Sequence, residues 1–252
     1  EQYSFENDHI TIIDTEIDIE MKIPFSTQHI PEGYSNGQKN DGGGVIHVDE
    51  EAEEVYIEKD GVLEGEYRLM HPSGAMKAQA YYHKGNLHGP SRFFHEDGTM
   101  LSQAWFVEGK RYGKALQNYA SGKIYSIQRY VDDIKEGRQE YYYENGTLKT
   151  HVEYDHGRFH GKTEIFLHDG NPQRDIMFVE GKRTGKEHRW YPGGTLMIEK
   201  EYSEDVQCGS FRRWHDNGAI AEEKVFHSLT KYDIRQWNVD GMLLREGVYD
   251  DN

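Results

Sequence analysis

Apolar and aromatic positions recur along this chain in short runs that are separated by glycine-containing turns. One unit begins at Gly137, continues through an aromatic-rich run to the dipeptide Asn145-Gly146, and then alternates polar and apolar residues as far as Tyr154. Alternation with a period of two is typical of β-strands, and Asn-Gly between two such runs signals a hairpin turn. Each unit therefore predicts two antiparallel strands. No stretch shows sustained 3.6-residue apolar periodicity, so we expect few helices.

The unit recurs through most of the chain at a constant spacing, which equals the sequence distance from Gly65 to Gly89. The phased positions comprise two glycine series, from Gly65 to Gly209 and from Gly74 to Gly218, and an aromatic series from Tyr82 to Phe226. Such phasing indicates a repeat array. We predict an all-β fold: an elongated array of antiparallel β-hairpins that forms a twisted open sheet. Pro172 lacks a backbone N–H, so we expect the Gly170 hairpin to be irregular at the start of its second strand.

The second turn of each unit has the form Gly-x-x-x-Gly, as in Gly109 to Gly113. Where the first glycine is lost, Asp133 and Asp205 replace it, and aspartate tolerates left-handed backbone. With the aromatic positions and the x-Gly-x-Leu turn, this pattern resembles the variant MORN repeat, which in bacterial chains is described as an antitoxin-component repeat. The resemblance covers about residues 61–250 and implies successive antiparallel hairpins in a long twisted sheet.

Residues 1–60 lack this pattern, and we interpret them as an acidic N-terminal cap and loop segment preceding the array of about 7.5 repeats at residues 61–252. Ile17, Ile19, Met21 and Ile23 alternate with polar residues and predict a half-buried strand. Residues 24–44 are rich in glycine and proline and predict a flexible loop, and residues 45–57 predict two strands around an acidic turn. A cap of this kind protects the open end of a repeat array.

Composition narrows the function classes. The mean hydropathy is −0.92, yet 13% of the residues are aromatic, which suits repeats that bury their rings against neighbours. The net charge of −16 is concentrated in residues 1–60, which hold 16 acidic and 3 basic side chains. We therefore expect no nucleic-acid binding and do not favour membrane association. Cys208 is the only cysteine, so no intramolecular disulfide forms. The compartment stays open, cytoplasmic or exported, because the sequence starts at Glu1 and a targeting segment could have been removed.

The motifs of common enzymes are missing from the sequence. It contains no Gly-x-Ser-x-Gly elbow, no phosphate-binding loop and no His-Glu-x-x-His pair. Fourteen histidines invite a metal hypothesis, but several occupy repeat positions that tyrosine fills elsewhere, which favours packing or surface roles. We predict that the chain is not an enzyme, and we expect neither a cofactor nor a native metal site.

Two sets of residues are candidates for binding a partner. The basic column is the residue after the second glycine in four consecutive repeats, namely Lys114, Arg138, Lys162 and Lys186. The aromatic ladder lies four residues before each turn glycine and becomes tryptophan in the last three copies, Trp190, Trp214 and Trp237. Each set also has a purely structural interpretation. The basic column could keep the strand edges solvated, and the aromatic ladder could pack between neighbouring hairpins.

These features predict a non-enzymatic interaction module that presents an extended sheet to another protein. The resemblance would make that partner a toxin. The alternative is an envelope- or lipid-associated structural scaffold, which the acidic segment disfavours and the basic column supports. An enzyme with an unrecognised site is the third class. The partner, the oligomeric state and the sheet face that binds are left open by the sequence.

Overall fold

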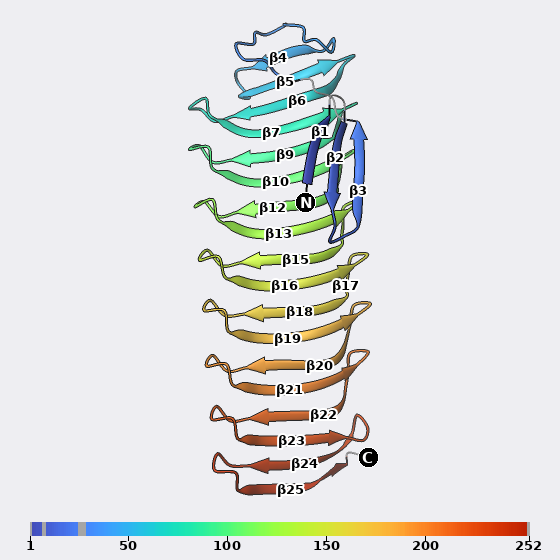
Figure 1. Ribbon diagram of the computed structural model, residues 1–252, viewed down its shortest axis with the longest axis vertical. Coiled ribbons are helices and arrows are strands. Elements are labelled where there is room, and N and C mark those ends of the chain that lie inside the picture. The colour runs from blue at the N-terminus through green and yellow to red at the C-terminus, as the bar shows by residue number, and fades with distance from the viewer. Residues whose placement is uncertain (1, 7–8, 25–28, 251–252) are drawn as a thin grey trace. The chain divides into compact units, whose positions relative to one another are not determined.

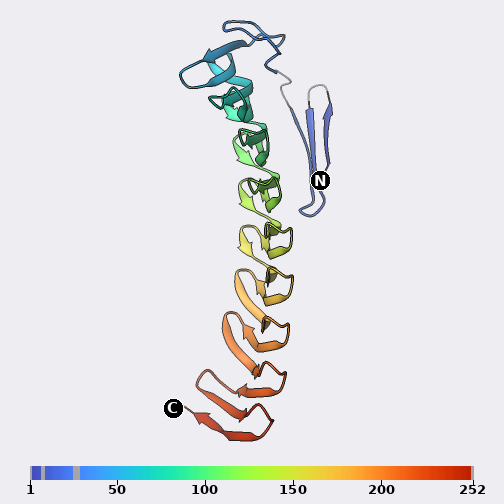
Figure 2. The same ribbon diagram turned by 90° about the vertical axis from the view of Figure 1, so that its left-hand side faces the viewer.

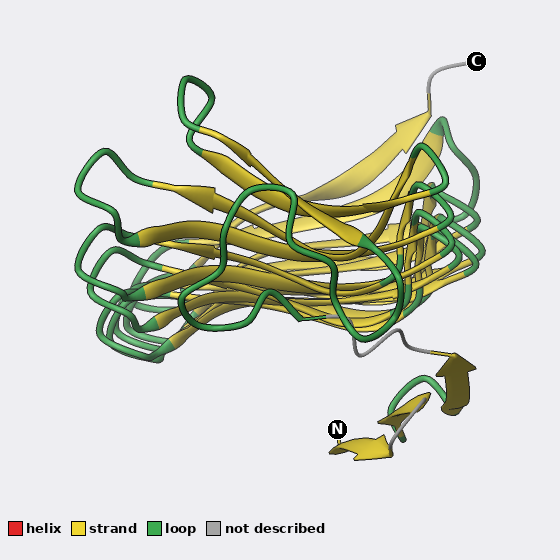
Figure 3. Ribbon diagram, turned by 90° about the horizontal axis from the view of Figure 1, so that it is seen from above, coloured by secondary structure: helices red, strands yellow, loops and turns green. Residues whose placement is uncertain are grey.

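The computed structural model describes residues 2–6, 9–24 and 29–250, which form strands, turns and loops (Figure 3). No helix is present among them, so none of the described segments is a helix that could cross a membrane. The chain divides into unit 1, Glu1–Gly137, and unit 2, Arg138–Asn252.

In unit 1 the repeat strands pair in antiparallel fashion with their sequence neighbours (Figure 1). They are β4 (Val45–Asp49), β5 (Glu54–Lys59), β6 (Val62–Met70), β7 (Met76–His83), β8 (Asn86–Leu87), β9 (Gly89–Phe94), β10 (Met100–Val107), β11 (Lys110–Arg111), β12 (Gly113–Asn118), β13 (Ile124–Val131) and β14 (Ile134–Lys135).

Unit 2 contains the same kind of open antiparallel sheet. Its strands are β15 (Gly137–Tyr142), which starts at the last residue of unit 1, β16 (Leu148–Asp155), β17 (Arg158–Phe159), β18 (Gly161–Phe166), β19 (Pro172–Val179), β20 (Lys182–Trp190), β21 (Leu196–Ser203), β22 (Val206–Trp214), β23 (Ile220–Phe226), β24 (Lys231–Trp237) and β25 (Leu243–Asp250). The predicted all-β array of antiparallel hairpins in an open sheet is thus confirmed.

The hairpin turns follow one pattern of backbone hydrogen bonds. Between β9 and β10 the N–H of His95 donates to the carbonyl of Thr99 at 2.8 Å, and the N–H of Gly98 donates to the carbonyl of His95 at 2.9 Å. Gly98 has a φ of +87°, a conformation that glycine adopts without a Cβ clash. The loop therefore extends from His95 to Thr99 and is longer than a tight Asn-Gly turn requires.

The turn at Gly170 corrects one expectation. Phe166 pairs with Pro172 in the same register as Phe94 with Met100, and the N–H of Leu167 donates to the carbonyl of Asn171 at 2.8 Å. The hairpin has a register shift at Phe166, as the other hairpins have at the corresponding position, and Pro172 adds no further irregularity because the first residue of this strand needs no N–H donor in the turn. At the second turns, Asp133 and Asp205 have φ values of +67° and +70°, as predicted for the residues that replace glycine.

An additional three-stranded sheet at the N-terminus packs on the repeat strands of unit 1 (Figures 1 and 2). Its strands are β1 (Gln2–Glu6), β2 (His9–Asp14) and β3 (Ile19–Pro24). Ile10 and Ile12 of β2 are fully buried in one cluster with Tyr81 of β7 and Trp105 of β10. The strand predicted at residues 17–23 corresponds to β3, whereas β1 and β2 were not predicted.

The segment at residues 29–44 is a loop, as predicted, and it is anchored to the sheet. Ile30 is buried in a second cluster with Ile46, Val55 and Ile57. The backbone N–H of Ile30 donates to the carboxylate of Glu66 at 2.8 Å. Residues 25–28 of the predicted flexible loop lie outside the described residues. The boundary of the cap at residue 60 stays a prediction, although β4 and β5 already pair within the repeat sheet.

Candidate binding surfaces

Alternation along the strands gives the sheet of unit 2 two faces with different side chains. Residues that pair directly across antiparallel strands lie on the same face, and successive residues lie on opposite faces. We call one the ionic face, defined by its central cross-strand row: Asp175, His188, Glu199, Arg212, Glu223, Arg235 and Glu246. We call the other the arginine face, defined by the adjacent row: Arg174, Arg189, Ile198, Arg213, Glu222, Gln236 and Arg245.

The ionic face alternates bases with acids, and its side chains pair with one another. His188 Nδ1 lies 2.8 Å from Asp175 Oδ1, and His188 Nε2 lies 3.3 Å from Glu199 Oε2. Arg212 lies 3.5 Å from Glu199 and 3.0 Å from Glu223. Because each base of this row is paired with acids on neighbouring strands, the row offers no excess of positive charge to a partner.

The basic column lies on this face in unit 2. Lys186 Nζ lies 3.1 Å from Glu199 Oε1, and Lys162 Nζ pairs with Glu164 and lies 3.3 Å from Asp175 Oδ2. Arg138 Nε lies 3.2 Å from Glu140 Oε1. Lys114 belongs to β12 of unit 1, where it pairs with Arg129 of β13 in the strand register. The three members of the column in unit 2 therefore lie beside acids of the same sheet, which the repeat period alone did not reveal.

The three tryptophans of the aromatic ladder end strands β20, β22 and β24 and are half-buried. The ring of Trp190 lies 5.6 Å from that of His188 on the ionic face. The carbonyl of Trp214 accepts a hydrogen bond of 2.9 Å from the hydroxyl of Tyr191. The carbonyl of Trp237 lies 3.1 Å from Nε2 of His215. The surroundings of the ladder therefore combine packing between hairpins with partial exposure, so its role in binding stays a prediction.

On the arginine face, two glutamates lie below the cations that surround them. Glu187 is fully buried and lies 2.9 Å from Nε of both Arg174 and Arg189. Burial raises the pKa of Glu187, but the hydrogen bond from Arg189 and the charges of both arginines outweigh it and hold the pKa below its ordinary value. Glu222 lies 3.3 Å from Arg213 and 3.1 Å from Lys224. Both carboxylates are therefore ionised structural partners of the basic side chains.

Aromatic rings and a small apolar pocket adjoin the arginine row. Lys224 lies over the rings of Phe211 and Tyr232, 5.4 and 5.1 Å from their centroids. At the other end of the face, a pocket of about 240 Å³ is lined by Val152, Phe159, Thr163, Ile165, Arg174, Ile176 and Phe178. Sequence analysis missed this surface. The sequence pattern that could have indicated this surface is the alternation along strands β20 and β22, in which Arg189 and Arg213 are next to residues that point to the ionic face.

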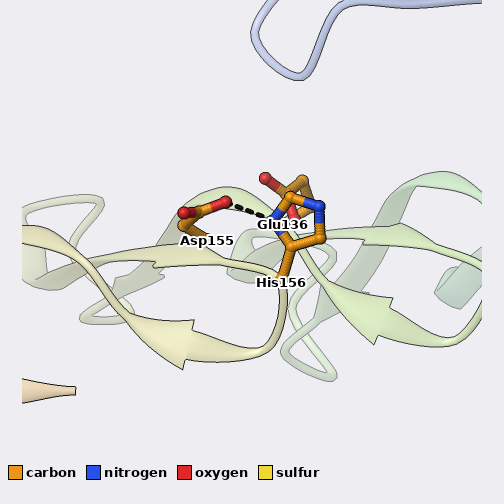
Figure 4. Close-up of side chains that lie close together, drawn as sticks. All are labelled: Glu136, Asp155 and His156. Atoms are coloured by element: carbon orange, nitrogen blue, oxygen red, sulfur yellow. Dashed lines mark hydrogen bonds and ion pairs between the residues drawn. The ribbon is translucent and has the colours of Figure 1, made fainter. Parts of the chain in front are cut away.

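Several histidines of unit 2 lie beside carboxylates. His151 is buried, with its two ring nitrogens 3.3 Å from Glu153 and 3.1 Å from Glu164. Asp155 and His156 pair at the turn after β16 (Figure 4). These are ion-pair arrangements.

Comparison with models of known protein families identifies one repeat unit of this chain. The sequence profile described as "MORN repeat variant" matches residues 135–156, which include the turn at Gly146 and the strand that follows it. The comparison with curated proteins gave no match. Copies of the same unit recur at a constant step with the same turn and strand register. The chain is therefore a MORN-repeat protein whose unit is the variant form of the repeat.

Proposed function

We propose that this chain is a non-enzymatic protein-interaction module in which the sheet of unit 2 binds another protein. The observation that carries the proposal is the separation of charge between its two faces. The ionic face matches its bases to acids, whereas the central row of the arginine face has four arginines and one glutamate. A surface on which cations outnumber acids, beside aromatic rings, is suited to a partner that carries acidic groups.

The titratable groups of the face support a role in binding over one in catalysis. A general acid at neutral pH needs a raised carboxyl pKa, which keeps the group protonated until the reaction. The pKa values of Glu187 and Glu222 are instead lowered because arginine, lysine and glutamine side chains outweigh the effect of burial. Both groups thus serve to hold basic side chains in place.

The repeat family suggests one identity for the partner. An antitoxin-like role, in which the bound protein is a toxin, is the narrower form of the proposal, and only the family resemblance supports it. A lipid-associated scaffold would use the same cations to contact phosphate groups. The apolar pocket beside Arg174 favours a protein, because one buried side chain fits a pocket of this size better than a lipid surface does.

The test uses the purified chain as bait in an extract of the organism that produces it, followed by calorimetry with each captured protein in purified form. The proposal expects saturable binding by at least one purified protein, with an affinity that weakens as salt increases. It is overturned if no captured protein binds once purified, or if the chain binds only vesicles of anionic lipid.

A further inference from the structure

The arginine row spans several strands at regular intervals. Arg174 and Arg189 lie on the adjacent strands β19 and β20, Arg213 lies on β22, and Arg245 lies on β25. Neighbouring strands are separated by about 4.8 Å. The guanidinium groups therefore follow a line across the strands, with steps of about 5, 10 and 14 Å.

The cations of this row reach solvent, and the acids beside them do not. The side chains of Arg174, Arg189 and Arg213 are 36%, 38% and 41% exposed. Those of Glu187 and Glu222 are 0% and 12% exposed. An approaching ligand thus meets guanidinium groups whose geometry is already fixed by buried carboxylates, which lowers the entropy lost on binding.

The pocket at one end of this row can hold one apolar side chain. Its volume of about 240 Å³ lies below the ~300 Å³ at which pockets for whole small molecules begin. Its wall includes Phe159, which is 39% exposed, and the buried Ile176. Arg174 belongs both to the pocket lining and to the arginine row, so an anchored side chain would lie directly beside the first cation.

We propose that the arginine face binds an extended acidic segment of the partner protein, which inserts an aromatic or aliphatic side chain into this pocket and runs across the strands towards Arg245. This inference rests on the proposed function and specifies the surface and the partner's chemistry. The seven strand steps from β18 to β25 span about 34 Å, and an extended chain rises about 3.3 Å per residue. The bound segment is therefore about ten residues long.

The probe is a synthetic ten-residue peptide with phenylalanine at its first position and glutamate at its third, sixth and tenth positions, the other positions being glycine and serine. A second peptide carries glutamine in place of each glutamate. Fluorescence anisotropy with the full chain measures the affinity of both. The expected result is binding of the acidic peptide that is at least tenfold tighter than binding of the glutamine peptide, because charge-assisted hydrogen bonds to arginine are lost.

Two matched pairs of variants locate the site. Arg213 and Arg212 are consecutive arginines with exposures of 41% and 40%, each paired with glutamate, and they lie on opposite faces. Arg213→Gln is expected to weaken the acidic peptide about tenfold, and Arg212→Gln less than twofold. Phe159 and Met177 are each 39% exposed, and only Phe159 lines the pocket. Phe159→Ala is expected to weaken binding, and Met177→Ala is expected to leave it unchanged.

Arg213→Gln could instead unfold the chain, because it leaves Glu222 with fewer partners. In that event Arg245→Gln and Arg235→Gln replace the first pair, since both residues are exposed and lie on opposite faces of the last two strands. The inference is overturned if the acidic peptide fails to bind, or if the variants of the two faces weaken it equally. It is also overturned if the peptide does not bind and Arg213→Gln instead abolishes a different interaction. That interaction would be either binding to phosphatidylglycerol vesicles or self-association measured by sedimentation. A purified partner that still binds every variant would leave the proposed function intact and remove only this surface.

Discussion

Trp105 provides a test of how the N-terminal sheet packs on unit 1. Its side chain is 1% exposed and belongs to the cluster that contains Ile10 and Ile12 of β2. Truncation of a buried tryptophan to alanine costs about 3–5 kcal/mol of unfolding free energy through lost burial and the cavity that remains. For a unit of this size, that cost corresponds to a melting temperature lower by about 10–15 °C.

The matched control is Met177, which occupies the same repeat position three units later and is 39% exposed. Met177→Ala is expected to change the unfolding free energy by about 0.5 kcal/mol or less, as at other exposed positions. Urea unfolding followed by circular dichroism measures both variants. A double-mutant cycle with Ile10→Ala adds a second criterion, because residues in one cluster couple by about 0.5–3 kcal/mol.

Two results would refute this reasoning. One is a Trp105→Ala variant that unfolds at the same urea concentration as Met177→Ala, which would mean that β2 does not cover Trp105 in solution. The other is a strictly additive cycle between Trp105 and Ile10, which would place the two residues in separate clusters.

Three further predictions follow from other contacts. Both Gly137 and Gly185 have positive φ, but a Cβ at Gly137 would lie 2.5 Å from Cγ2 of Ile17, whereas a Cβ at Gly185 would meet nothing within 4 Å. Gly137→Ala should therefore lower the melting temperature more than Gly185→Ala in a thermal scan. The folded-state pKa of Glu187 lies below its ordinary value of 4.5, so the stabilisation of the fold by this carboxylate is present above that pH and is lost as the pH falls through the folded pKa. Urea titrations between pH 7 and pH 3 should show this loss, and the unfolding free energy should depend less steeply on pH in Glu187→Gln. Glu66→Ala should destabilise unit 1 by about 2–4 kcal/mol in urea unfolding, because this buried carboxylate accepts hydrogen bonds from Arg68 and from the backbone N–H of Ile30. An effect below about 1 kcal/mol would show that the loop at residues 29–44 is not anchored at Glu66.

The turns of this fold were predictable from sequence because their determinants are local. Gly98 and Gly146 adopt positive φ within single loops, and Asp133 and Asp205 do the same where glycine is absent. The packing of β2 on Trp105 was not predictable in this way. It joins residues far apart in the sequence, and the alternation of apolar residues in β2 does not indicate which surface they contact.

The arginine face escaped sequence analysis for a related reason. Arg174 lies on the second strand of its hairpin, whereas Arg189 and Arg213 lie on first strands, so no single repeat position contains the whole row. Only the strand register places Arg174 directly opposite Arg189. Conversely, the basic column was visible because its members recur at the step of the repeat, but the acids that pair with Lys162 and Lys186 come from neighbouring strands.

The most direct test of the account is the affinity of a purified partner protein for the Arg213→Gln and Arg212→Gln chains, measured by calorimetry against the unmodified chain. The two positions are adjacent in sequence and similar in exposure, and they differ in the face on which they lie. We expect a dissociation constant about tenfold higher for Arg213→Gln and unchanged for Arg212→Gln. Equal affinities for the two variants, or weakening by Arg212→Gln alone, would contradict it.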